Sequence, residues 1–296
     1  MKLTNKYNIP KPIELAISNS SYNLGDKPSD ISCTRLIDSP CIRILSKLYD
    51  PDIEEDVSDM IWALIGTSIH YIIERAGAYT ENYEKEKRVY MYCQGWTISG
   101  QFDLYDKTDK ILYDFKIASV WEAINGVKQS RINQLNVLAS LMQANGYEIK
   151  GISVIYIFRD WIKVKAGKDN YPEKQVMVLP LDLLSREERW EYIKERVRLH
   201  QNAQKDLDNY LINGADDKLL HTTPCSQEER WQDDLKFAIM KKGRKSALRL
   251  VDTMEQAEIF IKNAGYNDTY IEERKSVPRR CLEYCPVAKY CKWFAK

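Results

Sequence analysis

The chain has 296 residues, of which 44% are hydrophobic and 29% are charged, and its formal net charge is +1. This length suits one large domain or two modest ones, and the apolar content can fill a sizeable core. A net charge near zero excludes a global electrostatic preference for nucleic acid, so any nucleic-acid surface has to be local.

No apolar run approaches the roughly 18–20 residues of a membrane helix, and the first residues, "MKLTNKYNIPKPIEL", lack the apolar centre of a signal peptide. We therefore expect a cytoplasmic protein without a membrane partner. Disulfides are disfavoured in that compartment, and clustered cysteines there more often hold metal. The odd count of seven cysteines also argues against a complete disulfide framework.

The N-terminal half predicts a helix followed by three strands. Residues 1–30, rich in Pro, Ser and Asn, predict an irregular lead-in, and apolar residues at helical spacing predict a helix over 58–78. "CQGW" and "DKTDK" are typical of hairpin turns. They join three runs of β-type residues, at 87–93, 96–106 and 110–119.

A second helix is predicted over 130–146, with Gly146 as its C-cap, followed by a buried strand at 151–158 and another strand at 174–181. A long amphipathic helix begins after Ser185, its expected N-cap. The order helix, three strands, helix, strand predicts an α/β fold with a mixed central sheet over residues 1–215. From about residue 215 the pattern weakens, so residues 216–296 predict a smaller appendage that holds four cysteines.

Two neighbouring predicted strands carry acidic residues, Asp103 in "GQFD" and Asp114 in "YDFK". A hairpin brings these carboxylates together, and Asp114 and Lys116, two residues apart, point to one face of their strand. Grouped carboxylates repel each other unless a cation lies between them, and oxygen ligands suit magnesium or manganese. From spacing alone, a surface Asp–Lys pair is an equally good interpretation.

Two helical residues extend this group. His70 has Gly66 one turn before it and Glu74 one turn after it on the same helix face, and Gln134 opens the apolar part of the second helix. Taken in order, Gly-x-x-x-His, Gly-x-x-Asp (with Gly100), Asp-x-Lys and Gln resemble the motifs of the PD-(D/E)XK nuclease superfamily, in its RecB-like branch. The predicted element order resembles that family's restriction-endonuclease-like core as well.

The resemblance implies that His70, Asp103, Asp114 and the carbonyl of Ile117 bind Mg²⁺ or Mn²⁺. It implies that Lys116 is the catalytic lysine and that Gln134 helps to place Lys116 or the DNA. Glu74 is a candidate for a supporting or metal-binding role, against a solvated helix charge. The sequence departs from the family pattern at Phe102, where proline is common, and at Leu138, where tyrosine is common.

Three cysteines crowd near the C-terminus as Cys281-x3-Cys285-x5-Cys291, and a tetrahedral zinc site or a cubane cluster needs four ligands. Cys93, in a predicted strand, is interpreted as structural. RecB-like nucleases of the helicase–nuclease and CRISPR-associated types carry a 4Fe–4S cluster that pins the C-terminus to the nuclease domain. Phage-encoded members imply Cys225, in "PCSQEERW", as the fourth ligand, whereas the CRISPR-associated type implies Cys41 or Cys33. Zinc is the competing metal.

The sequence hypothesis is therefore a metal-dependent deoxyribonuclease, an exonuclease acting on DNA ends or single strands in phage recombination, replication or host DNA degradation. Its expected partners are DNA and a phage recombination or replication protein. The basic runs 241–245 and 271–296, the latter interleaved with aromatic residues, suit contact with a strand. A catalytically idle DNA-binding module and a zinc-stapled structural protein are the alternatives.

Overall fold

The computed structural model divides the chain into two compact units, Met1–Thr223 and Pro224–Lys296. The residues that it describes are 1–18, 27–76, 81–168, 170–213 and 223–294. The predicted domain boundary after residue 215 falls between 214 and 222, outside the described residues.

The first unit is built on a mixed sheet with the strand order β2-β5-β6-β7-β8, and β4 pairs with the other side of β5. The pairs β4–β5, β5–β6 and β7–β8 are antiparallel, whereas β2–β5 and β6–β7 are parallel. This confirms the predicted α/β class with a mixed sheet. The strands are β2 (Ile31–Ser32), β4 (Tyr83–Cys93), β5 (Trp96–Asp106), β6 (Ile111–Ala118), β7 (Gly151–Phe158) and β8 (Val176–Leu181).

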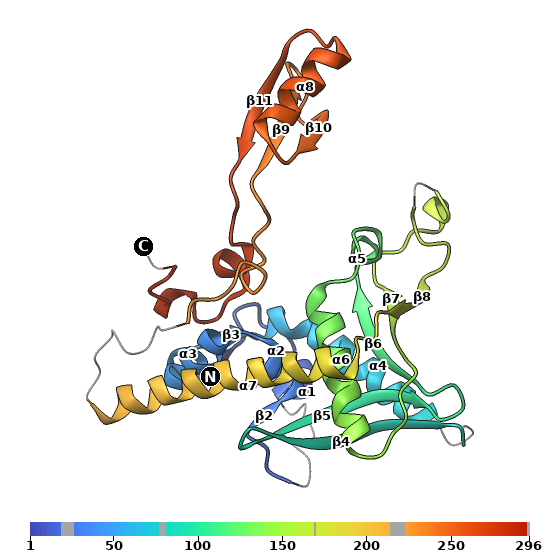
Figure 1. Cartoon of the computed structure of the whole chain (residues 1–296), viewed down its shortest axis with the longest axis vertical. Helices are drawn as coiled ribbons and strands as arrows, with labels where there is room; N and C mark the ends of the chain where they lie inside the picture. Colours follow the sequence, from blue (N-terminus) through green and yellow to red (C-terminus); the bar gives the residue numbers. More distant parts are fainter. Residues whose placement is uncertain (19–26, 77–80, 169, 214–222, 295–296) are drawn as a thin grey trace. The chain divides into compact units, whose positions relative to one another are not determined.

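Helices stand before and between the strands of this sheet along the chain (Figure 1). α4 precedes the three strands β4 to β6, α6 lies between β6 and β7, and the short α5 is inserted before α6. The helices of this unit are α1 (Lys11–Ser18), α2 (Cys33–Ile37), α3 (Pro40–Leu48), α4 (Ile61–Arg75), α5 (Val120–Ile124), α6 (Gln129–Ala144) and α7 (Arg186–Ile212).

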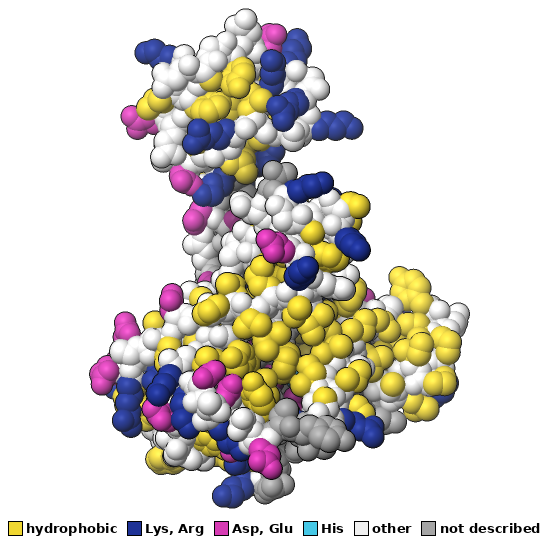
Figure 2. Space-filling model, turned by 90° about the vertical axis from the view of Figure 1, so that its right-hand side faces the viewer, with side chains coloured by type: hydrophobic (Ala, Val, Ile, Leu, Met, Phe, Trp, Pro, Cys, Tyr) yellow, Lys and Arg dark blue, Asp and Glu magenta, His cyan; other side chains and the backbone are white. Residues whose placement is uncertain are grey.

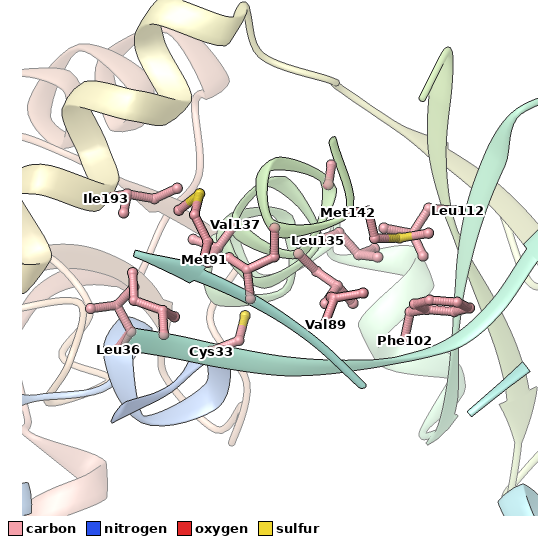
Figure 3. Close-up of a cluster of buried hydrophobic side chains, with 14 of the residues drawn as sticks. Cys33, Leu36, Val89, Met91, Phe102, Leu112, Leu135, Val137, Met142 and Ile193 are labelled. Carbon is pink, nitrogen blue, oxygen red and sulfur yellow. The ribbon is translucent and has the colours of Figure 1, made fainter. Parts of the chain in front are cut away.

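The main core lies between the sheet and the helices α2, α6 and α7 (Figure 3). Phe102 and Leu112 enter it from the sheet, Leu135 and Met142 from α6, and Ile193 from α7, and all five are fully buried. Burial of apolar side chains of this size contributes about 1.5–3 kcal/mol each. This core therefore fixes how α6 lies on β5, the strand that carries Asp103.

Local signals set the ends of several elements as predicted. The Ser185 hydroxyl caps α7 by accepting from the Glu188 amide, and the Glu188 carboxylate accepts from the Ser185 amide in return. The C-cap of α6 is Asn145 rather than the predicted Gly146, which comes next with φ +87°, a conformation that favours glycine. Gln94 and Gly95 both have positive φ, which forms the two-residue turn between β4 and β5 and fixes their register.

The predicted irregular lead-in is wrong, because residues 1–30 contain β1 (Lys2–Thr4) and α1 (Lys11–Ser18). β1 pairs in parallel with the distant β3 (Glu54–Asp56). The buried Asp56 carboxylate accepts hydrogen bonds from the Lys6 amide and the Thr4 hydroxyl, which hold its pKa well below the usual range. Pairing between segments fifty residues apart leaves no local periodicity to recognise.

The second unit contains an antiparallel sheet of order β10-β9-β11 with α8 beside it. Its elements are β9 (Lys236–Lys241), β10 (Arg249–Val251), α8 (Met254–Ala264) and β11 (Thr269–Arg274). The three-residue β10 is too short to show alternation, which explains the weak sequence pattern of this region.

Helix α4 has the predicted apolar periodicity, yet none of its side chains is fully buried. Trp62, Ile65, Tyr71 and Ile72 are exposed. Figure 2 shows hydrophobic side chains gathered on one face of the larger unit. Among the described residues, no helix combines the length and the apolar character that crossing a bilayer requires.

Gly100 permits the close approach of β5 to α6. A Cβ atom at this position would lie 2.8 Å from Leu138 Cδ1, 3.2 Å from Leu141 Cδ2 and 3.3 Å from Cys33 Cβ. We predict that Gly100→Ala destabilises the protein by about 1–3 kcal/mol through overpacking, measured by denaturant unfolding. Gly151→Ala, also in a strand but 3.7 Å from its nearest neighbour, is the control. Equal stability of the two variants would contradict this account of the packing.

Candidate metal centre

Asp103 and Asp114 lie where two strands of the sheet separate. β5 and β6 pair over three positions, and Leu104↔Tyr113 is the last pair before the site. Counting one step further places Asp103 opposite Asp114. Beyond this point β5 pairs with β2, and β6 continues only along β7. The separation opens the sheet and exposes both carboxylates to one cavity.

Two further side chains reach Asp103 from α4 and β4. His70 Nδ1 lies 3.1 Å from Glu86 Oε1 and 3.6 Å from Asp103 Oδ1. One ligand atom from each of these three residues lies within 4.8 Å of the others. Gln101 Nε2 donates to Glu86 Oε2 at 2.7 Å, and the Phe115 amide donates to Asp103 Oδ2 at 2.8 Å. These bonds hold both carboxylates while leaving one oxygen of each near His70.

Sequence reasoning missed Glu86. The pairs Lys85↔Leu104 and Lys87↔Phe102 place Glu86 directly opposite Asp103 on the neighbouring strand. The signal was present, because the two-residue turn at "CQGW" fixes the register and counting back along both strands reaches this pair. Glu86 has φ +48°, a left-handed conformation that is unusual for a non-glycine residue in a strand.

These residues line one cavity of about 380 Å³. Its walls include His70, Glu86, Asp103, Asp114, Lys116 and Gln134, and also Glu74, Cys33, Arg88 and Leu138. Among the predicted site residues, Ile117 does not line the cavity. Glu74 lies at the wall without joining the group of three ligands. Leu138, where the family pattern has tyrosine, packs toward Gly100.

Lys116 and Asp114 form an ion pair inside the cavity. Lys116 Nζ lies 2.7 Å from Asp114 Oδ2 and 2.8 Å from Asp114 Oδ1, and the Asp114 side chain is 7% exposed. The structure therefore brings His70 and Asp103 together as predicted, but it adds Glu86 to them and gives Asp114 to Lys116. Phe115, between Asp114 and Lys116 in the sequence, is buried, and its ring lies edge-to-face against the His70 ring with the centroids 6.2 Å apart.

The charges in the cavity shift the pKa values of two groups. Burial, and next the negative charge of Asp114, raise the pKa of Asp103 to about 7. The hydrogen bond to Glu86 raises the pKa of His70 despite its partial burial. Two carboxylate oxygens suit Mg²⁺ or Mn²⁺, and the imidazole nitrogen favours a transition metal such as Mn²⁺ over Mg²⁺. A bound divalent cation would offset the burial and the repulsion that make Asp103 hard to ionise.

The four cysteines of the predicted cluster all belong to the second unit. Cys225 precedes β9, and the other three follow β11. Burial, then the charges of Cys225 and Cys291, raise the pKa of Cys281. Burial raises the pKa of Cys285 most, and Cys281 and Cys225 raise it further. Cys225 is thus near enough to influence two of the three C-terminal thiols.

The other cysteines lie in the first unit. Cys33 is in the main core and donates to the Gln134 carbonyl at 3.5 Å, and burial raises its pKa to about 12. Cys93 is buried in the same core, and Cys41 is buried on α3. Among the described residues, no three cysteine sulfurs lie within 4.8 Å of one another.

Comparisons with known proteins find similarity among solved structures alone. No family model and no curated protein matches the chain. The crystal structure of SSO0001 is similar to this chain with a TM-score of 0.43 and 15% identity, over 63% of this chain and 84% of that one. A TM-score at this level does not establish a common fold.

Metal affinity should depend on pH because the metal has to displace a proton from Asp103. We predict that Mn²⁺ binds about fivefold more weakly at pH 6 than at pH 7, with a change of only about twofold from pH 7 to 8, measured by titration calorimetry. The stability of the metal-free protein has the opposite pH dependence: it falls as the pH rises. A carboxyl whose folded pKa is raised to about 7 contributes stability at low pH that is lost between about pH 4 and 7. An affinity that is constant from pH 6 to 8 would contradict the assignment of Asp103 as a ligand.

Proposed function

We propose that this protein is a metal-dependent deoxyribonuclease that hydrolyses phosphodiester bonds. The observation that supports it most is the cavity that joins the ligand group His70, Glu86 and Asp103 to the Asp114–Lys116 pair. Ligands for a divalent cation beside an ammonium group are what hydrolysis of a phosphodiester requires, because negative charge develops on the phosphate during the reaction.

Each residue has a distinct task in this proposal. A bound Mg²⁺ or Mn²⁺ would activate a water molecule and neutralise charge on the phosphate that is attacked. His70, Glu86 and Asp103 hold the cation, and Gln101 keeps the Glu86 carboxylate turned toward it. Asp114 holds the Lys116 ammonium in the cavity at 2.7 Å. From there Lys116 orients the attacking water or stabilises the developing charge.

The substrate and its context follow from the resemblance to RecB-like PD-(D/E)XK nucleases. The order α4, β4, β5, β6, α6, β7 corresponds to that family's core order, with β6 and β7 parallel. We infer an exonuclease acting on DNA ends or single strands in phage recombination, replication or host DNA degradation. A phage recombination or replication protein is the proposed partner, and Gln134 lies in the cavity wall where it can contact Lys116 or DNA.

We also infer a 4Fe–4S cluster held by Cys225, Cys281, Cys285 and Cys291. Several contacts connect the chain after Cys225 with the chain before Cys285. Gln232 bridges to Pro278, Arg279 pairs with Asp233 at 2.6 Å, and the Trp231 and Tyr284 rings lie 5.2 Å apart. These contacts support convergence of the four thiols within the second unit. Four thiolates would serve zinc as well, so metal analysis has to decide.

The nuclease proposal predicts that the protein loses DNA cleavage when Lys116 or the proposed ligand Glu86 is replaced. We expect Lys116→Ala and Glu86→Gln each to lower Mn²⁺-dependent cleavage of end-labelled single- and double-stranded DNA by at least about 100-fold. Glu84→Gln is the matched control, because Glu84 lies on the same strand but bonds to Tyr147 and Lys87 outside the cavity. This variant should cleave like the wild type.

Glu86→Gln should also weaken Mn²⁺ binding in calorimetry, whereas Lys116→Ala should not. The nuclease proposal would be rejected if the wild-type protein bound Mn²⁺ and DNA but cleaved neither single-stranded nor double-stranded DNA. The catalytically idle DNA-binding module would then be the better account.

The cluster proposal predicts which cysteine completes it. After anaerobic purification we expect Cys225→Ser to lose most of its iron and its visible absorbance, because three thiolates hold a cubane poorly. Cys41→Ser should keep both, since Cys41 belongs to the first unit. The reverse result would assign Cys41 as the ligand, and stoichiometric zinc without iron would replace the cluster by a zinc site.

A further inference from the structure

A second cavity of the first unit is lined by three cations that have no carboxylate partner among the described residues. This cavity, of about 490 Å³, is formed by α2, α3 and the segment around β2. Arg35, Arg43 and Lys47 line it together with Ser29, Ser32 and Ser46. Its two carboxylates are engaged elsewhere, Asp30 by the Thr97 amide at 2.7 Å and Asp50 by the N-terminal amine at 2.7 Å.

Arg43 is the unusual member of this group because it is a buried cation with neutral partners. Its side chain donates to His200 Nδ1 at 3.0 Å, to the His200 carbonyl at 2.8 Å and to Gln204 Oε1 at 3.0 Å. The residue is 7% exposed. A buried cation is ordinarily paired with a negative charge, because its removal from water is costly.

Lys47 increases this imbalance. Lys47 Nζ donates at 3.0 Å to Gln204 Oε1, the same oxygen that Arg43 uses. Burial and then the charge of Arg35 lower the pKa of Arg43, and burial and then the charge of Arg43 lower the pKa of Lys47. The charge of Asp208 acts on both cations, but its carboxylate accepts from Gln204 and bonds to neither of them. An anion in the cavity would relieve this repulsion directly.

This cavity adjoins the candidate metal centre. Ser32 lines both cavities. Ser29 Oγ lies 2.9 Å from Ser99 Oγ, which lines the metal cavity and also accepts from Arg88 Nη1 at 3.3 Å. Ser99 precedes Asp103 by four residues on β5, about 13 Å along a strand. A chain that carries regularly spaced anions could therefore occupy both cavities at once.

We propose that Arg35, Arg43 and Lys47 form a phosphate-binding subsite that holds the substrate strand a few nucleotides from the metal centre. This inference rests on the proposed nuclease function and adds how the strand is positioned. Guanidinium groups and serine hydroxyls are the side chains that phosphate contacts in DNA complexes use most. Free inorganic phosphate has the same chemistry, so the experiment has to separate the two sources.

The test uses a double variant, Arg35→Gln with Lys47→Gln, because both side chains are exposed and Arg43 is retained for folding. Binding of a fluorescent 20-nucleotide single strand is measured by anisotropy in EDTA over a range of salt concentrations. We expect about tenfold weaker binding and a salt slope smaller by about 1.4, or about 0.7 for each lost phosphate contact. Lys163→Gln with Lys165→Gln removes the same charge from an exposed segment outside both cavities and is the control.

Two further measurements separate this proposal from the nuclease proposal. Hydrolysis of bis(p-nitrophenyl) phosphate, which is too short to reach the second cavity, should be unchanged in the double variant while KM for the oligonucleotide rises. If the wild type bound DNA more tightly than the double variant and yet cleaved nothing, this result would reject the nuclease proposal and retain the phosphate subsite. Cleavage of DNA with unchanged affinity and salt slope in the double variant would overturn the subsite. Inorganic phosphate could instead stabilise the wild type against unfolding but not the double variant, while both proteins bind DNA equally well. That result would also overturn the proposed DNA subsite.

Discussion

Mutual repulsion among three carboxylates is the constraint around which the first unit is arranged. Glu86, Asp103 and Asp114 enter one cavity, and because their side chains are mostly buried, solvent screens their charges weakly. Lys116 offsets Asp114 at 2.7 Å, and His70 lies 3.1 Å from Glu86. Asp103 has only a backbone amide at hydrogen-bond distance among these groups, and its pKa rises to about 7. With His70 neutral, as a metal ligand has to be, and Lys116 paired with Asp114, a cation between Glu86 and Asp103 would offset the repulsion between these two carboxylates.

This arrangement depends on how β5 changes its neighbour along its length. Near Asp106 it pairs with β6, and near Ser99 it pairs with β2. Asp103 lies at the change, so neither β2 nor β6 pairs with it on that edge of β5. The same exchange attaches β2 and the cation-lined cavity to the strand that carries the metal ligand. One topological feature thus accounts both for the open cavity of the candidate metal centre and for the position of the proposed phosphate subsite beside it.

The sequence predicts those parts of the fold and of the candidate site that depend on local patterns. The strand 96–106 and the capped start of α7 followed from alternation, turn residues and a capping serine. Asp103, Asp114 and Lys116 were predicted to lie together because a short hairpin joins their strands, and His70 was added because the order of the motifs resembles that of RecB-like nucleases. Glu86 was not, because its role arises from cross-strand pairing rather than from proximity in sequence. The basic cavity was missed for a similar reason, since Arg43 and Gln204 meet across 161 positions. Pairing of β1 with β3 also joins distant segments without a local pattern.

The two candidate inorganic centres use residues of different units, and this separates their roles. The proposed metal ligands His70, Glu86 and Asp103 lie within the first unit, and the four cysteines proposed for the cluster lie between Cys225 and Cys291, within the second. The small sheet β9–β11 with α8 is inserted between Cys225 and Cys281, so a cluster there would close the base of this insertion. Closing a loop of this length stabilises chiefly by restricting the unfolded chain. The proposed hydrolysis requires no electron transfer, so a cluster bound by these cysteines would contribute structurally, by fixing the two chain segments from which the insertion projects.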